Sequence, residues 1–554
     1  MPKQKIETSD IASAEKLLGI EYTKCERDQM VENLEGQILS AKMRRTTELD
    51  NTVPMASRFD PRLPGFSMPA GSCVKTKSQS SLLPDSEEDI AFATVGELGH
   101  WIKNGQITSR KLTEIYLSRI TKFQEKLECF ATVTNDHALA EADAMDALTR
   151  VGISLGPLHG IPYGLKDLFD TNGIKTGWGA EPYSKRIPAK DATIVKKLRA
   201  AGAVMLGKTT LGALAYNDIW YGGRTKNPWN INEGSSGSSA GSASATAAGL
   251  CAFAIGTETL GSITSPSQRC GTTGLRPTFG RVSRAGGMAL CWSLDKVGPI
   301  CRCVEDTGLV LSILNGYDEN DLCSIRAPFK FDSTKSIENL TIGYLPEAFE
   351  DGATDVDRAS LEAAKSLGVK IKKVKLEDLP YMSLINILYA EAAASFEHLT
   401  LSNEDDTLTW QDDGAWPNTF RKARFLSAVD HIQLDRLRYL VMKALDDLFS
   451  EIDVLIGPFD TGPMLVASNF TGHPCLHLRA GFETLASRGA GSLGEGKLST
   501  GEAGEGEKFI VPHGISLWGR LFEEETILNF GMALENKLGV STKRPGLPFE
   551  QKIT

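Results

Sequence analysis

Residues 232–249 have the sequence NEGSSGSSAGSASATAAG, with six serines, four glycines and no charged side chain after Glu233. Runs rich in Gly and Ser commonly behave as flexible linkers. The residues that follow argue against a linker, because residues 250–263, LCAFAIGTETLGSI, form an apolar run that ends in glycine and serine. We therefore expect the serine-rich segment to lead directly into the core of a folded body.

The overall composition is that of an ordinary globular protein. The chain has 554 residues, of which 41% are hydrophobic and 23% charged, and this length is ample for a large core. Its net charge of −10 argues against a broad basic surface, so we expect no direct binding of nucleic acid. No apolar run reaches the roughly 18 residues of a membrane span, and the N-terminus lacks the apolar region of a secretory signal.

The ten cysteines are scattered along the chain. Cys301 and Cys303 form a C-x-C pair, but a zinc site would need a second pair or a neighbouring histidine. We therefore predict reduced thiols in a cytoplasmic protein that binds no metal and no cofactor.

Residues 1–60 are predicted to form a polar helical arm. Thr23 and Glu26 fit a capping box, in which a hydroxyl and a carboxylate bond each other's helix-end amides, and Met30, Leu34 and Ile38 follow at helical spacing. We expect this apolar stripe to be buried. The next stretch, DNTVPMASRFDPRLPGF, holds three prolines and predicts an extended connector.

Residues 61–554 are predicted to form one α/β body. Residues 94–123 fit two amphipathic helices, and residues 191–203 fit another helix that leads into a buried strand at 204–211. This alternation of helix and short apolar strand favours a central sheet. Residues 484–507 are rich in Gly, Ser and Glu and predict a mobile insertion rather than a domain.

Three short motifs point to other chemistries and are weaker. Residues 202–209, GAVMLGKT, match a phosphate-binding loop, but that loop needs its glycines between a strand and the following helix. Here the middle residues resemble a strand that follows a helix. Ser13–Lys16 and Ser293–Lys296 match S-x-x-K without the partner motifs of serine–lysine enzymes, and we expect both to be exposed polar residues.

A nucleophile elbow is the third motif. Residues 237–241, GSSAG, match G-x-S-x-G, which requires a preceding apolar strand and a histidine further along the chain. The residues before it are polar, and none of the downstream histidines has a distinctive setting. These are His398, His431, His473, His477 and His513. A Ser-His-Asp enzyme is therefore the weaker alternative.

Lys166 stands in an apolar context within GPLHGIPYGLKDLFD, residues 156–170. A buried lysine is costly when charged and readily becomes neutral, so it can act as a base. Two plainer roles stay open: its ammonium reaches water along an apolar stem, or the adjacent Asp167 pairs with it.

Three segments together resemble the amidase signature family. They are residues 156–170, the serine-rich segment and residues 256–283, GTETLGSITSPSQRCGTTGLRPTFGRVS. The family pattern of G-I-P-x-x-x-K-D, G-S-S-x-G-S-A and G-T-[DE]-T-x-G-S-I is present in order. The resemblance covers roughly residues 90–330 strongly, and it is greatest to bacterial-type amidases related to the A-type subunit of glutamyl-tRNA amidotransferase. It implies an α/β fold whose mixed central sheet is covered by helices on both faces, with a signature core at about 150–300.

The resemblance also implies roles for individual residues. Ser262 would be the nucleophile, Ser238 a bridging serine that follows a cis peptide bond, and Lys166 the base. The amides of Thr259, Leu260, Gly261 and Ser262 would form the oxyanion hole. These roles are chemically consistent, because a serine hydroxyl needs a base to become a good nucleophile and a second hydroxyl can relay the proton.

This chain departs from the family pattern at several positions. Leu260 replaces a glycine, and a leucine at positive φ would be strained. Thr264 stands where the family often has arginine, so any ion pair of that arginine is absent or supplied elsewhere. Gln268 and Arg269 also differ from the commoner family residues.

The sequence leaves three functional hypotheses open. The first is a free-standing amidase that acts on a small carboxamide and releases ammonia or an amine through an acyl-serine intermediate. The second is the glutaminase (A-type) subunit of a tRNA-dependent amidotransferase, and the third is an inactive scaffold. The retained Ser-Ser-Lys set argues against the scaffold. The arm favours the first hypothesis over the second, and so does the departure of residues 459–474 from the glutamine-recognition pattern of the A-type subunit. For side chains near the substrate we expect packing rather than contact; they are Tyr216, Asp218, Trp220, Trp416 and Phe420.

The arm weakly resembles the small C-type subunit of the same amidotransferases, which wraps the A-type subunit like a belt. Such an arm would pack on its own body or on a second protomer, and the latter would give a homodimer. An ordinary terminal helix is the equal alternative.

Overall fold

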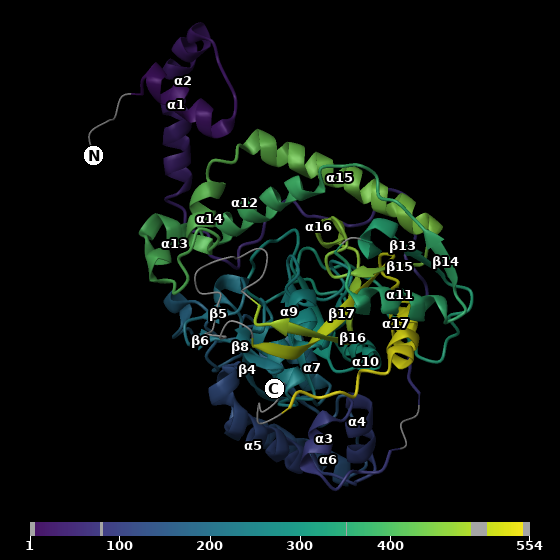
Figure 1. Ribbon diagram of the computed structural model, residues 1–554. Helices are drawn as coiled ribbons and strands as arrows, with labels where there is room; N and C mark the ends of the chain where they lie inside the picture. Colours follow the sequence, from purple (N-terminus) through teal and green to yellow (C-terminus); the bar gives the residue numbers. More distant parts are fainter. Residues whose placement is uncertain (1–5, 78–80, 351, 489–506, 547–554) are drawn as a thin grey trace.

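The computed structural model describes residues 6–77, 81–350, 352–488 and 507–546. Its centre is one sheet of eleven strands with the order β14-β13-β15-β17-β16-β10-β11-β9-β3-β4-β2 (Figure 1). In that order the strands are β14 Lys370–Lys373, β13 Thr341–Tyr344, β15 Val454–Pro458, β17 Lys508–Gly519, β16 Cys475–Ala486, β10 Thr273–Arg276, β11 Lys296–Cys301, β9 Phe253–Glu258, β3 Pro162–Lys166, β4 Val204–Thr209 and β2 Phe130–Val133.

The sheet is mixed. β3 pairs in parallel with both β4 and β9, while β11 runs antiparallel to β9. Every residue of these four strands is buried, as expected for strands covered on both faces. Three small two-stranded sheets add β1 Cys73–Lys75 with β12 Lys330–Asp332, β5 Ile219–Trp220 with β6 Gly223–Arg224, and β7 Lys226–Asn227 with β8 Asn230–Gly234.

Helices flank the sheet (Figure 1), which confirms the predicted α/β fold. They are α1 Thr8–Leu18, α2 Lys24–Arg44, α3 Glu87–Phe92, α4 Val95–Lys103, α5 Ser109–Leu127, α6 Asn135–Arg150, α7 Thr193–Ala200, α8 Ala240–Ala247, α9 Thr264–Cys270, α10 Val304–Leu314, α11 Asp355–Lys365, α12 Ile385–Ser395, α13 Glu397–Ser402, α14 Trp416–Ala423, α15 Ala428–Glu451, α16 Met464–Phe470 and α17 Glu524–Leu538.

The predicted elements around the signature core are present. The amphipathic pattern of residues 94–123 gives α4 and α5, and residues 191–203 give α7, which leads into β4. Because α7 comes before β4, the residues that match a phosphate-binding loop form a buried strand, and Lys208 within it is fully buried.

The N-terminal arm is a pair of helices that projects from the body (Figure 1). The Thr23–Glu26 capping box is present, and Arg44 Nη2 reaches Glu397 Oε2 of the body at 2.6 Å. The prediction of a buried stripe is wrong for Ile38, which is 40% exposed. The reason is length: α1 has 11 residues and covers only part of the 21-residue α2.

Two further sequence predictions are corrected. Ser13 and Lys16 are exposed as expected, but Ser293 and Lys296 are buried. Lys296 begins β11 inside the sheet, and Ser293 is enclosed by Glu391 and Arg438. Thr484–Ala486 belong to β16 rather than to an insertion, and residues 489–506 of the predicted insertion lie outside the described residues.

All ten cysteines are free thiols. Among the described residues, no helix combines the length and apolar character that a membrane crossing requires.

Candidate active site

Lys166 is the last residue of β3 and lies at the centre of a group of hydroxyls. Its Nζ is 2.8 Å from Ser238 Oγ, 3.0 Å from Ser239 Oγ and 2.8 Å from Thr257 Oγ1. The side chain is fully buried, and none of these neighbours carries a charge. Burial therefore lowers the pKa of Lys166 well below its usual value, although Asp295 and Glu258 act in the opposite direction from a distance.

The serine-rich segment that contains Ser238 is packed rather than flexible. The Gly237–Ser238 peptide bond is cis, as the family resemblance implies. A side chain at Gly237 could not be accommodated, since a Cβ there would lie 1.8 Å from the carbonyl oxygen of Asn217. All eight residues of α8, which follows, are buried, so the small side chains allow a close approach to the sheet.

Ser262 follows β9 in a turn that Glu258 holds from inside. The Glu258 carboxylate accepts hydrogen bonds from the amides of Ile263 and Thr264, both at 2.9 Å, and from the Thr264 hydroxyl. Arg276 Nη1 lies 2.7 Å from Glu258 Oε1, with both side chains fully buried. Burial alone would raise the pKa of Glu258, but Arg276 and the hydrogen bonds lower it to about 2. Arg276 is thus the cationic partner of Glu258 in this turn.

The backbone of Thr259–Ser262 is suited to donate hydrogen bonds to a ligand. These four amides donate no hydrogen bond to another described residue. Gly261 has φ 84°, whereas Leu260 is not among the described residues with positive φ. The leucine is therefore accommodated without the strain considered above. The Thr259 hydroxyl donates to Asp295 Oδ1 at 2.6 Å, which fixes the start of this segment.

Two of the three predicted catalytic side chains are in contact, and the third is not hydrogen-bonded to them. Lys166 and Ser238 are in direct contact, and the Ser239 amide donates to the Ser262 carbonyl at 3.1 Å. Among the described residues, however, the Ser262 hydroxyl makes no hydrogen bond to Ser238 or to any other side chain. Ser262 itself is buried, with 8% of its surface exposed.

Two residues of the site were missed at the sequence level. Thr257 bonds Lys166, and its place in the G-T-E-T motif was the available signal. Asp295 accepts from Thr259 and from the amides of Leu290 and Cys291. Its carboxyl is buried, which raises its pKa. It lies inside the Ser293–Lys296 motif, whose polar pattern predicted exposed residues.

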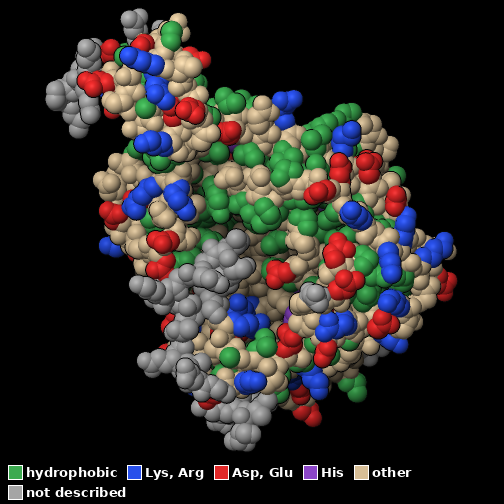
Figure 2. All heavy atoms as spheres, turned by 45° about the horizontal axis from the view of Figure 1, so that its top comes forward, with side chains coloured by type: hydrophobic (Ala, Val, Ile, Leu, Met, Phe, Trp, Pro, Cys, Tyr) green, Lys and Arg blue, Asp and Glu red, His purple; other side chains and the backbone are tan. Residues whose placement is uncertain are grey.

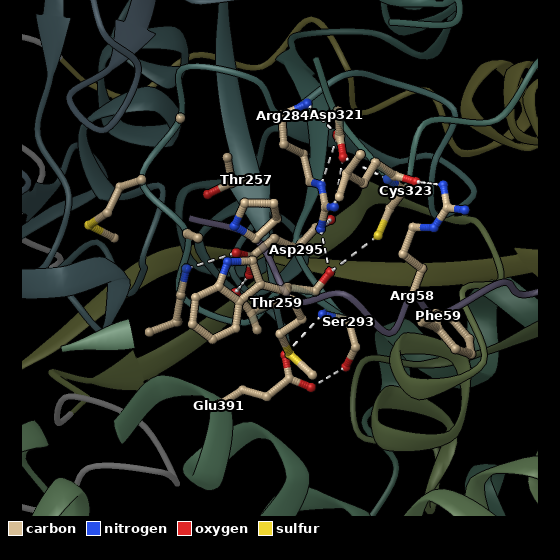
Figure 3. A pocket seen from close by; sticks show the side chains of 18 of the residues that line it. Arg58, Phe59, Thr257, Thr259, Arg284, Ser293, Asp295, Asp321, Cys323 and Glu391 are labelled. Atoms are coloured by element: carbon tan, nitrogen blue, oxygen red, sulfur yellow. Dashed lines mark hydrogen bonds and ion pairs between the residues drawn. The ribbon is translucent and has the colours of Figure 1, made fainter. Parts of the chain in front are cut away.

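A cavity of about 1000 Å³ lies next to this centre, and its lining residues include neither Lys166 nor Ser238 nor Ser262. Thr257 and Thr259 line one side of it, and Arg58 and Phe59 of the N-terminal connector line another (Figure 3). The side chains expected to pack rather than to contact substrate do not line it. Tyr216, for example, lies against the rings of Trp410 and Trp416, and Trp416 stacks on Phe420.

The histidines do not support a nucleophile elbow. His513 lies between Asp357 and Glu483, at 2.9 and 2.8 Å, and His473 and His477 are buried beside hydroxyl groups. Within the described ranges, no histidine bonds Ser238, Ser239 or Ser262.

Comparison with known proteins shows which family the chain belongs to. Residues 111–528 match the family model described as Amidase. The A-type subunit of a glutamyl-tRNA(Gln) amidotransferase from Roseiflexus sp. is 31% identical over 489 residues, covering 82% of this chain and 99% of that protein. The protein of the same name from Chromohalobacter salexigens is 34% identical over 442 residues, covering 70% of this chain and 90% of its own length.

Solved structures give the same result. Native peptide amidase from Stenotrophomonas maltophilia is 26% identical, with a TM-score of 0.69 over 83% of this chain and 99% of that one. With its fold, its signature segments and these relatives, the chain belongs to the amidase signature family and is an enzyme acting on carbon–nitrogen amide bonds.

Proposed function

We propose that the enzyme transfers the acyl group of a carboxamide to Ser262. The Ser262 oxygen attacks the carbonyl carbon while Ser238 takes the Ser262 proton and passes its own proton to neutral Lys166. The amides of Thr259, Leu260, Gly261 and Ser262 stabilise the oxyanion, an effect typically worth a few kcal/mol. When the C–N bond breaks, the proton returns from Lys166 to the departing nitrogen, and ammonia or an amine leaves.

Water then cleaves the acyl-serine ester by the same route in reverse. Lys166 accepts a proton of the attacking water through Ser238, and the Ser262 oxygen recovers its proton as the acid is released. The observation that carries the proposal is the fully buried Lys166 amine, with no charged partner in contact and with Ser238 Oγ at 2.8 Å.

Two physiological roles use this chemistry. The names of the sequence relatives favour the A-type glutaminase subunit of a tRNA-dependent amidotransferase, which would pass ammonia to a partner protein, over a free-standing amidase. The cavity volume of about 1000 Å³ supports the second role, a free-standing amidase, since it is at the upper end of the roughly 300–1,000 Å³ typical of drug-sized ligands. We place either role in the cytoplasm, where ten free thiols are stable.

Trapping the acyl-enzyme site tests the proposal. A serine-directed fluorophosphonate should label Ser262, which peptide mass analysis would locate, and Ser262→Ala should abolish ammonia release while circular dichroism stays unchanged. Label on Ser239 would overturn the proposal and restore the elbow. Ammonia release from glutamine and from a panel of other primary amides then separates the two roles.

A further inference from the structure

The N-terminal connector passes along the cavity beside the proposed site. Residues 50–62 contain no helix or strand, and several of them line the cavity together with Thr257 and Thr259. Figure 3 shows Arg58 and Phe59 on the side of the cavity away from Thr257. Part of the cavity wall therefore comes from a segment that precedes the proposed nucleophile, Ser262, by about 200 positions in the sequence.

The connector is held in this position at several points. The Asn51 side-chain amide donates to the carbonyl of Ala289 at 2.8 Å and accepts from the amide of Ala289, also at 2.8 Å. Arg58 Nη1 donates to the carbonyl of Leu322 at 2.8 Å. The Phe59 ring lies 3.6 Å below the buried guanidinium of Arg438. A segment with such contacts at both ends is a fixed wall.

The loop that binds Asn51 also contacts residues 259–262, the proposed oxyanion hole. Ala289 precedes Leu290 and Cys291, whose amides hold the carboxylate of Asp295. Asp295 in turn accepts the hydroxyl proton of Thr259 at 2.6 Å. The same loop therefore contacts the connector on one side and positions the proposed oxyanion hole on the other.

The chemistry of the cavity indicates what it admits. Its lining includes the apolar side chains of Leu168, Trp178, Met288 and Trp292. Its charged groups are largely paired with one another, as in Arg284 with Asp321 at 2.9 Å and Arg186 with Asp170 at 2.6 Å. A wide space with aromatic walls and mutually neutralised charges suits a large apolar group better than the short, zwitterionic glutamine.

The far side of the cavity is formed by α15. Ile432, Tyr439 and Met442 of this helix line it, while Val429 and Leu440 are exposed on the same helix. Hydrophobic side chains gather on this face of the molecule (Figure 2). The half-buried Met55 of the connector adds apolar surface to the same lining, so a bulky substrate group would touch both segments.

We propose that residues 51–62 form a specificity wall of the amide cavity, which selects primary carboxamides that carry a bulky apolar group beyond the reacting carbonyl. This inference rests on the proposed acyl transfer at Ser262 and names the substrate class for the free-standing role. Met55 is the position at which it is tested, because this side chain lines the cavity without belonging to the Asn51, Arg58 or Phe59 attachments.

The test compares two amides that differ by one phenyl group, propionamide and 3-phenylpropanamide. In the full-length enzyme, 3-phenylpropanamide should have the lower KM. Met55→Trp should fill the space for the ring and change the ratio of the two KM values by about tenfold, the lower end of what a pocket contact discriminates. Met43→Trp is the matched control, since Met43 is 64% exposed on α2 and should leave the ratio unchanged.

A binding measurement keeps the test independent of turnover. In a Ser262→Ala background, calorimetry should give a Kd for 3-phenylpropanamide that Met55→Trp weakens about tenfold. A preference of the wild-type enzyme for propionamide or glutamine, an unchanged KM ratio, or an unchanged Kd would overturn the wall. If no amide is hydrolysed but the Kd changes as expected, the proposed acyl transfer is contradicted, while the role of residues 51–62 in binding the apolar group is supported.

Discussion

Two lysines on adjacent strands have the same burial and different surroundings. Lys166 ends β3, and Lys208 lies on β4 opposite Leu165; both side chains are fully buried. Lys208 Nζ lies 3.6 Å from Asp167 Oδ1 and donates to the carbonyl of Phe169 at 2.6 Å. Lys166 contacts hydroxyls and one carbonyl, that of Thr257 at 3.3 Å.

The difference shows that the partner, rather than burial alone, decides what a buried lysine can do. Burial lowers the pKa of Lys208, and the nearby Asp167 carboxylate opposes part of that effect. The net result is a pKa lowered to about 8. Burial also lowers the pKa of Lys166 well below its usual value, and no carboxylate of the described residues is in contact with Lys166 to oppose this effect. At neutral pH Lys208 is a structural cation, whereas Lys166 can be a neutral base.

The largest expected effect separates the two lysines by activity. Lys166→Met should reduce kcat by about 10⁴-fold, at the upper end of general-base effects, because no other base among the described residues bonds Ser238. Lys208→Met should retain kcat to within about tenfold. Steady-state ammonia release at pH 8 measures both, and equal losses in the two variants would show that Lys166 acts only in packing.

The second effect separates them by stability. Lys208→Met leaves the buried Asp167 carboxylate unpaired, and breaking a buried ion pair typically costs about 3–5 kcal/mol. Lys166→Met removes an amine without a charged partner and should cost less. Urea denaturation at pH 7 compares the two, and Lys208→Met combined with Asp167→Asn should recover part of the loss. A double variant as unstable as the single one would contradict the pairing.

The sequence could identify much of this site because its information is local. Through the family resemblance, the three signature segments predict Lys166, Ser238, the cis peptide bond and the turn at Ser262. The second and third segments are short strand–turn–helix units, β8 to α8 and β9 to α9, and the first contains β3 with Lys166 at its end. The two lysines were harder to distinguish. KD at 166–167 and KT at 208–209 are both preceded by apolar residues, and only the parallel register of β3 and β4 brings Asp167 toward Lys208.

Contacts between residues that are far apart in the sequence could not be predicted from local sequence patterns. Asp295 lies in a motif that predicted exposed residues, and its role depends on β11 pairing with β9. Asn51 contacts Ala289, 238 positions away, and nothing in either stretch indicates the other. β16 lies next to β10 although some 200 residues separate them in the chain. Such pairings follow from how elements pack together, which periodicity along the sequence does not encode.

A third prediction concerns the two serines that contact Lys166. Ser238→Ala should lower kcat by about 10²-fold, less than loss of the base, since a water molecule can partly replace a hydroxyl relay. Ser239 Oγ also bonds the carbonyl and the amide of Thr257, both at 3.1 Å. Ser239→Ala should therefore mainly lower the melting temperature. Calorimetric melting and kcat, measured on both variants, distinguish the relay from the support; the reverse pattern would exchange their roles.

The smallest effect is expected in the pH profile of activity, which tests which of the two lysines must lose its proton. A base must be neutral, so activity should rise with pH as Lys166 loses its proton and then level off. Because burial lowers the pKa of Lys166 well below its usual value, the plateau should begin below the ordinary lysine pKa of about 10.4. Lys208, with a pKa of about 8, also loses its proton within the measured pH range, so a rise in activity near that pH has two candidate sources. Measuring kcat/KM from pH 5 to 10 for wild type and Lys208→Met resolves the two, since the variant lacks the second lysine and should keep the same midpoint. A midpoint that moves in Lys208→Met would assign the titration to Lys208, and a rise complete near the histidine value of about 6.5 would assign it to a histidine.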